Sequence, residues 1–211
     1  MNMLYNDFLL SRQSQPFYHS TEPCGWYFFQ DGFNDIEIQK IRKYADTLEF
    51  NEASLAEHQE VNEGIDHNYR KTSTAWIDII EETTWIYEKM GDMVVEANNN
   101  MWKFDLLGSM ELIQFARYYG SEDDKGNFYD WHADSGPSTN LRKISMIVQL
   151  TDEDEYEGGE VMMHESSTPQ VFPRGKGTVI CFPSYMSHKV TPVTKGIRES
   201  MVQWMSGPPL R

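Results

Sequence analysis

Two imidazoles, a carboxylate and a guanidinium stand in the second half of the sequence at a spacing that suits metal chemistry. His132 and Asp134 are two positions apart in the segment Tyr-Asp-Trp-His-Ala-Asp, residues 129–134. In an extended strand, residues i and i+2 point to the same side, so both side chains can reach one point. His188 offers a second imidazole, and Arg198 follows it by ten residues. Two histidines and one carboxylate on one face of an ion, with the opposite positions open, are typical of a non-heme Fe(II) oxygenase.

The arginine predicts a second part of the site. In a strand, Arg198 shares one face with Ser200, Val202 and Trp204. If Arg198 points into a barrel it needs an anionic partner, because a buried unpaired charge is very costly. The neighbouring predicted strands offer no obvious carboxylate, and arginine suits a carboxylate through two parallel hydrogen bonds. We therefore expect a carboxylate cosubstrate beside the metal.

Each of these signals has an ordinary structural alternative. A His-x-Asp pair alone is a weak signal, and His188 or Arg198 alone could be an exposed side chain. The order His-x-Asp, later His, then Arg ten residues on, with strands between, is far more specific. The remaining histidines have no partner at ligand spacing and are not predicted to bind metal: His19, His58, His67 and His164.

The N-terminal half is predicted to supply supporting elements. Asn34 is typical of a helix N-cap, and apolar residues at spacings of three and four favour an amphipathic helix over residues 35–49. A second helix is predicted over 82–100, and we assign its methionine-rich stripe to core packing. Strands are predicted at 26–29 and 71–79.

Strands dominate from residue 109 onward. Many short strands at regular spacing favour a sandwich or barrel, with the helices packed outside the main sheet. We therefore predict a mainly β fold with supporting helices. The final two strands are expected to form a hairpin around a turn at Lys195-Gly196. The predicted strands cover 111–119, 143–150, 160–164, 170–172, 178–182, 188–193 and 197–205.

Two connecting segments carry separate expectations. Residues 51–70 are polar with little periodicity, and long loops of this kind in compact domains are often functional lids. Gly158-Gly159 is more typical of a turn or bulge than of a phosphate cradle, because one glycine pair does not make a P-loop.

Length and charge bound the possible partners. The 211 residues are within the range of one domain. We expect 1–105 to form a support region with the lid loop, and 106–211 to form the catalytic core. The net charge of −15 argues against binding a phosphate backbone, so no nucleic acid partner is expected.

The same composition bears on location. There is no run of eighteen apolar residues, so no membrane span is expected. Residues 1–12 lack the pattern of a signal peptide, so a cytoplasmic location is expected. Cys24 and Cys181 are far apart in sequence and are expected to be free thiols in a reducing compartment. No CxxC pair is present, so a metal site built on these cysteines is not expected.

The second half of the chain resembles the prolyl 4-hydroxylase-type 2-oxoglutarate/Fe(II) dioxygenases, especially their bacterial PKHD-type hydroxylase branch. The resemblance covers roughly residues 110–206. The last matching segment is the most specific, and the N-terminal half matches only in the order of its elements. The matching segments are 128–134, 154–161, 177–184 and 188–198.

This resemblance implies a double-stranded β-helix, the cupin-like jelly roll, with Fe(II) held by His132, Asp134 and His188. It implies that 2-oxoglutarate chelates the iron and that its far carboxylate lies on Arg198. Collagen-type relatives carry lysine at that arginine, so the chain departs from their branch.

The resemblance also assigns residues around the cosubstrate. A family tyrosine that precedes a glycine matches Tyr119, with Tyr118 as the close alternative because strand parity is open. Tyr129 matches an aromatic residue that lines the pocket, and Ser200 matches a position that assists the arginine.

The implied reaction consumes O2 and 2-oxoglutarate, releases succinate and CO2, and leaves a hydroxyl group on the substrate, with L-ascorbate as a candidate reductant. A prolyl residue of a peptide or protein is the first expected substrate. A free amino acid or other small molecule is the alternative, because the motifs bind iron and cosubstrate rather than substrate. A metal-free binding jelly roll is a third hypothesis. The sequence does not indicate an oligomeric state.

Overall fold

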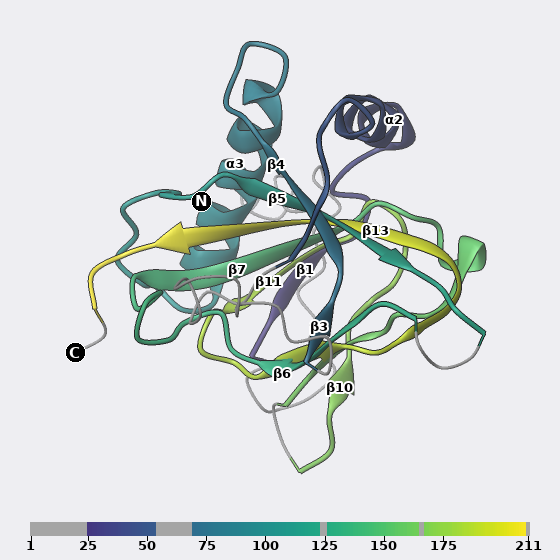
Figure 1. Ribbon diagram of the computed structural model, residues 1–211. Coiled ribbons are helices and arrows are strands. Elements are labelled where there is room, and N and C mark those ends of the chain that lie inside the picture. Colours follow the sequence, from purple (N-terminus) through teal and green to yellow (C-terminus); the bar gives the residue numbers. More distant parts are fainter. Residues whose placement is uncertain (1–24, 54–68, 123–125, 165–166, 210–211) are drawn as a thin grey trace.

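The computed structural model describes residues 25–53, 69–122, 126–164 and 167–209, and these form two antiparallel sheets with helices on one side (Figure 1). The larger sheet runs in the order β1-β11-β7-β13-β5-β4-β2, and β8 pairs with β13 beside this path. Its strands are β1 (Tyr27–Phe29), β11 (Val179–Pro183), β7 (Arg142–Gln149), β13 (Val193–Ser206), β5 (Ile113–Tyr119), β4 (Ser73–Ile77), β2 (Asn51–Glu52) and β8 (Tyr156–Gly158).

The smaller sheet faces the larger one from the side opposite the helices (Figure 1). Its order is β10-β9-β12-β6-β3. Its strands are β10 (Gln170–Val171), β9 (Val161–Met163), β12 (His188–Val190), β6 (Phe128–His132) and β3 (Arg70–Lys71). The predicted mainly β jelly-roll fold is confirmed.

Both predicted helices are present. Helix α2 (Asp35–Ala45) begins at a capping box, in which Asn34 and Glu37 each accept the other's backbone N–H. It ends four residues earlier than predicted, because Thr47 turns its N–H and hydroxyl onto the Tyr44 carbonyl. Helix α3 (Thr84–Asn100) buries the predicted methionine stripe, and a short 3-10 helix, η2, spans Glu153–Glu155.

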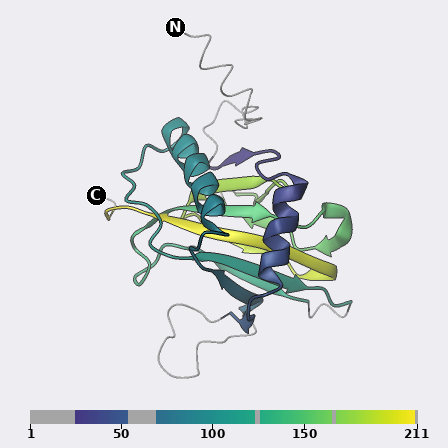
Figure 2. The same ribbon diagram turned by 90° about the horizontal axis from the view of Figure 1, so that it is seen from above.

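The helices cover one face of the larger sheet (Figure 2). An apolar core lies between the helices and this sheet, and it includes Ile41 of α2, Met90 of α3 and Met201 of β13. A second core, with Ala116, Ile147 and Phe182, lies on the opposite face of the larger sheet. Alternation along the central strands therefore sends one set of side chains to the helices and the other between the sheets. None of the helices in these described segments is long and apolar enough to cross a membrane.

The predicted terminal hairpin is wrong. Strand β12 ends at Val190 and pairs with β6 and β9 in the smaller sheet, whereas β13 belongs to the larger sheet. Pro192 lies between them and lacks the N–H that a continued ladder requires. Gly196 does not form a hairpin turn; it lies within β13 at φ +73°, beside a shift in register.

The loop expected over 51–70 is bounded by β2 and β3, and the lid prediction falls on residues 54–68, outside the described segments. Gly158 and Gly159 connect β8 to β9 with φ values of +71° and +65°, which confirms the predicted turn. A Cβ atom on Gly159 would lie 3.0 Å from Cδ of Arg198, so a larger residue at this position would crowd the arginine side chain.

Candidate functional site

The sequence separates His132 and His188, but the sheet pairs them. They are register partners on β6 and β12, and their ring centroids are 4.2 Å apart. Asp134 follows two residues after the end of β6. Its Oδ1 lies 3.8 Å from Nε2 of His132, and its Oδ2 lies 3.6 Å from Nε2 of His188. One ligand atom from each of the three residues lies within 4.8 Å of the others.

Backbone carbonyls orient both imidazoles. Nδ1 of His132 lies 2.7 Å from the Asp130 carbonyl, and Nδ1 of His188 lies 3.0 Å from the Met186 carbonyl. A carbonyl can only accept, so each Nδ1 carries the proton and each Nε2 lone pair is free. This arrangement is typical of metal-binding histidines, whose second nitrogen donates to a carbonyl or carboxylate.

Asp134 is held by its own surroundings. Ser145, fully buried on β7, donates its hydroxyl to Oδ2 at 2.6 Å. The Asp134 carbonyl accepts from the Thr139 hydroxyl at 2.8 Å and from the Arg142 guanidinium at 3.3 Å. The turn that follows β6 therefore fixes the carboxylate in place.

Electrostatics lower the pKa of both His132 and Asp134. Burial and the neighbouring His188 lower the pKa of His132 against the opposing effect of Asp134. Burial raises the pKa of Asp134, but His188, His132 and the Ser145 hydroxyl together lower it by more, so the net shift is downward. A carboxylate and a neutral imidazole are the forms that bind a metal ion.

Arg198 points into the space between the sheets and shares the cavity with Ser200, Val202 and Trp204, the residues predicted to lie on its face. It is 1% exposed, and no carboxylate of the described residues pairs with it. Its Nη2 donates to Oε1 of Gln149 at 2.9 Å, its Nη1 approaches Oγ of Ser200 at 3.4 Å, and its Nε has no partner there. Among the described residues this buried guanidinium has only neutral partners, so an anionic partner is expected.

Strand parity corrects the predicted tyrosine. Tyr118 is the register partner of Arg198, is 5% exposed, and places its ring 5.2 Å from the guanidinium carbon. Tyr119, the residue predicted to contact the cosubstrate, is 42% exposed and does not line the cavity. Successive strand residues point to opposite faces, so only one of the pair can face Arg198.

Tyr129 lines the cavity, as the family resemblance implied. Its ring stacks on His132 with centroids 3.4 Å apart. Burial raises the pKa of its phenol, so the group remains an uncharged hydroxyl at neutral pH.

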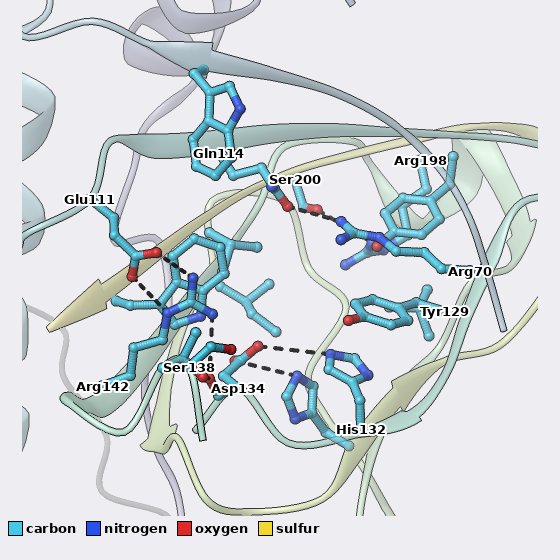
Figure 3. Close-up of a pocket in the computed structure, with 18 residues that line it drawn as sticks. Arg70, Glu111, Gln114, Tyr129, His132, Asp134, Ser138, Arg142, Arg198 and Ser200 are labelled. Atoms are coloured by element: carbon cyan, nitrogen blue, oxygen red, sulfur yellow. Dashed lines mark hydrogen bonds and ion pairs between the residues drawn. The ribbon is translucent and has the colours of Figure 1, made fainter. Parts of the chain in front are cut away.

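One cavity of about 370 Å³ is lined by the His132–Asp134–His188 cluster, Arg198, Ser200 and both Tyr118 and Tyr129 (Figure 3). Arg198 and Ser200 lie at one end, and the His132–Asp134–His188 cluster lies on one wall. The far end is lined by Trp76, Trp204 and the Glu111–Arg142 ion pair. Nε of Arg142 donates to Glu111 at 2.6 Å, and its guanidinium carbon lies 3.8 Å from the Trp204 ring centroid.

Sequence reasoning missed several residues that line the cavity or hold the residues that line it. Ser145 and Gln149 share one face of β7 with Ile147, and this period-2 spacing is the signal that could have found them. Arg70 and Glu111 lie at the borders of predicted loops, where parity cannot be assigned. Arg142 precedes a predicted strand and gave no signal of its own.

Comparison with known proteins agrees with this geometry. Residues 113–206 match the 2OG-Fe(II) oxygenase superfamily. A PKHD-type hydroxylase of Idiomarina loihiensis is 32% identical over 97 residues, 46% of this chain and 44% of that protein. A PKHD-type hydroxylase of Saccharophagus degradans is 30% identical over 135 residues, 60% of this chain and 58% of that protein. The chain thus spans about half the length of these relatives.

Solved structures share the fold. A Pseudomonas putida prolyl-4-hydroxylase superposes with a TM-score of 0.64 at 21% identity, over 87% of this chain and 93% of that one. A prolyl hydroxylase from Trichoplax adhaerens, in complex with a peptide fragment of the hypoxia inducible factor oxygen degradation domain, gives 0.68 at 17% identity. That match covers 86% of this chain and 83% of the other.

The matched region contains β5 through β13, and with them the His132–Asp134–His188 cluster and Arg198. Residues 113–206 of this chain therefore form a 2OG-Fe(II) oxygenase domain, with PKHD-type hydroxylases among its relatives.

Proposed function

We propose that the chain is a 2-oxoglutarate- and Fe(II)-dependent dioxygenase that hydroxylates a prolyl residue of a peptide or protein. The observation that carries this proposal is a His-His-Asp cluster and a buried arginine without a carboxylate partner in one cavity. In the balanced reaction, O2 supplies one oxygen atom to the substrate and one to succinate. The 2-oxoglutarate loses CO2 as it becomes succinate.

The chain's donor set fits Fe(II). Two imidazole Nε2 atoms and one carboxylate form the three-ligand face used by non-heme iron oxygenases. We assign His132, Asp134 and His188 as the ligands. Bound Fe(II) would supply the open coordination positions at which O2 and the 2-oxo acid react. Asp130, Met186 and Ser145 orient the ligands through the hydrogen bonds described above.

The cosubstrate assignment follows from Arg198. We propose that the far carboxylate of 2-oxoglutarate lies on this guanidinium, with Tyr118 and Ser200 beside it. Gln149 holds the guanidinium in place through its side-chain carbonyl. Tyr129 then closes the side of the cavity between the arginine and His132, which excludes water from the reacting centre.

The far end of the cavity is assigned to the substrate. Trp204 and Trp76 present flat apolar faces 6.5 Å apart at their centroids, and such surfaces suit the ring of a prolyl residue. Trp76 is 45% exposed, so this end reaches the surface, where a longer chain has room. The prolyl hydroxylases among the similar structures, one of them with a bound peptide, support the same substrate class.

The test combines two readouts on the same protein. With Fe(II), 2-oxoglutarate and ascorbate as reductant, succinate formation is expected without substrate and is expected to rise with a proline-containing peptide. Mass spectrometry is expected to show one added oxygen on that peptide. Succinate formation that survives His132→Ala would refute the assigned site. Succinate formation with no oxygenated product over a broad peptide panel would refute the peptide substrate.

A further inference from the structure

Arg70 is a second buried guanidinium in the same cavity. It lies on β3 of the smaller sheet, is 9% exposed, and lines the cavity with Arg198 (Figure 3). Its Nη2 donates to Oε1 of Gln114 at 2.9 Å, and its guanidinium carbon lies 4.4 Å from the Tyr129 ring centroid. Nε is buried without a partner, and no carboxylate of the described residues pairs with this guanidinium.

Among the described residues that line the cavity, the charges do not balance without a further anion. The described lining residues include three arginines, Arg70, Arg142 and Arg198, but only two carboxylates. Glu111 neutralises Arg142, and Asp134 belongs to the metal cluster. The two positive charges of the proposed metal cancel the two negative charges of 2-oxoglutarate, and the charges of Asp134 and Arg198 cancel each other. One positive charge remains, and it is the charge of Arg70.

Arg70 is held by a different side chain from Arg198. Its partner Gln114 lies opposite Val202 on β13, whereas Arg198 lies opposite Tyr118. Gln114 and Tyr118 are four residues apart on β5, which is about 13 Å along a strand. Arg70 and Arg198 therefore have separate anchors, and both lie on the side of the cavity away from Glu111 and Arg142 (Figure 3).

We infer that Arg70 binds a carboxylate of the substrate, so that the substrate carries a free carboxylate close to the carbon that is hydroxylated. Its source is a C-terminal residue, a free amino acid or an acidic side chain next to the reacting residue. Arginine grips a carboxylate through parallel charge-assisted hydrogen bonds, and burial strengthens them. The inference rests on the proposed oxygenase function and narrows its substrate class.

Binding of matched acid and amide probes tests this inference. The protein is loaded with Mn(II) and saturated with N-oxalylglycine, an unreactive 2-oxoglutarate analogue, and titrated by calorimetry. The three pairs are acetyl-Gly-Pro as acid and amide, free proline and prolinamide, and acetyl-Pro-Asp-amide and acetyl-Pro-Asn-amide. At least one acid is expected to bind tenfold or more tightly than its amide partner, the range of charge-assisted hydrogen bonds. The pair that discriminates identifies the source of the carboxylate.

Variants assign the preference to Arg70. In Arg70→Gln the preference for the acid is expected to fall at least fivefold. Lys71→Gln removes the same charge from the next residue of β3, which does not line the cavity, and is expected to keep the preference. Arg70→Lys keeps the charge without the planar fork and is expected to lie between wild type and Arg70→Gln. The acid–amide comparison is made within wild-type protein, so it holds even if a variant folds poorly.

Three outcomes overturn the inference. The first is a wild-type preference for the acid below tenfold in every pair, which includes the case in which no probe binds. The second is a preference that Arg70→Gln lowers by less than fivefold. The third is a rise of more than threefold in the 2-oxoglutarate concentration that Arg70→Gln requires for succinate formation. The last would assign Arg70 to the cosubstrate. Absence of Fe(II)-dependent succinate formation in the wild-type protein would instead refute the oxygenase function, whatever the probes show.

Discussion

His132 and His188 face each other directly across the ladder between β6 and β12, and each donates its Nδ1–H to a carbonyl two residues earlier in its own strand or turn. This pairing means that the positions of the two Nε2 atoms are set by the sheet and not by loops. Sites built on strands hold their geometry better than sites on loops. Asp134 completes the cluster from the turn immediately after β6.

Loss of one imidazole is expected to remove tight metal binding. His188→Ala takes away one of three proposed ligands and should weaken Mn(II) binding by more than about 100-fold, beyond the 10–100-fold cost of losing an outer partner. Calorimetric titration measures this. His164→Ala is the matched control, because His164 lies outside the cluster, and it is expected to bind Mn(II) as wild type does. Equal losses in both variants would contradict the assignment.

Removal of the buried guanidinium is expected to act on the cosubstrate alone. Arg198→Gln should raise the 2-oxoglutarate concentration for half-maximal succinate formation by about 10- to 100-fold, because charge-assisted hydrogen bonds contribute about 1.5–3 kcal/mol. Mn(II) affinity should stay within threefold of wild type. Arg174→Gln, which removes an arginine paired with Glu160 outside the cavity, is the control. If Arg198→Gln lost the metal instead, the role given to this arginine would be wrong.

The two neighbouring tyrosines give an internal comparison. Tyr118→Phe deletes a hydroxyl on a ring that faces Arg198 and is expected to raise the 2-oxoglutarate requirement by about 2- to 10-fold, the range of one neutral hydrogen bond. Tyr119→Phe changes an exposed residue and should leave that requirement unchanged. Steady-state kinetics of the two variants distinguish them, and the reverse result would restore Tyr119 as the contact.

The hydroxyl of Ser145 is expected to tune the metal site through Asp134. Ser145→Ala removes the hydrogen bond to Oδ2 and should lower Mn(II) affinity by about 10-fold, within the range for partners of metal ligands. Ser73→Ala, on β4 and outside the cavity, is the control. Unchanged Mn(II) affinity in Ser145→Ala would show that Asp134 is positioned without this hydroxyl.

Glu199 is expected to support the fold from the opposite face of the strand that carries Arg198. It is 4% exposed and lies 2.6 Å from both the Arg42 and the Arg117 guanidinium, which ties α2 to β13. Glu199→Gln should lower the free energy of unfolding by about 2 kcal/mol. That is less than the usual 3–5 kcal/mol for a broken buried pair, because Arg42 is 39% exposed.

Asp46→Asn provides the comparison for this ion-pair network. Asp46 also pairs with Arg117 but is 68% exposed, so its loss should cost less than about 1 kcal/mol. Denaturant titration of both variants measures the difference. Equal costs for the two substitutions would mean that burial of Glu199 contributes nothing to the stability of the fold.

Local patterns were enough to predict the elements that hold the site. Asn34 and the apolar periodicity after it predicted the start of α2 and placed its end within four residues. The alternation of Arg198, Ser200 and Trp204 predicted that these three residues share one face of β13. The i, i+2 spacing of His132 and Asp134 was enough to predict that they lie together, although Asp134 lies in the turn after β6. These features depend on neighbours in sequence, so the sequence expresses them directly.

Long-range pairing and strand parity were harder to infer. Two predicted strands around a turn at Lys195-Gly196 suggested a hairpin, but Pro192 lies where the chain passes from one sheet to the other. Parity at the end of β5 decided between Tyr118 and Tyr119, and a one-residue shift reverses every side chain. Arg70 is inward only because β3 pairs with β6, which no local pattern indicates.

The most direct test is a crystal structure of the protein with Mn(II) and N-oxalylglycine. Anomalous density for manganese is expected between Nε2 of His132, Nε2 of His188 and the Asp134 carboxylate, with the far carboxylate of the analogue on Arg198. Manganese bound at any other group of residues, or an analogue whose far carboxylate lies away from Arg198, would contradict the proposed site.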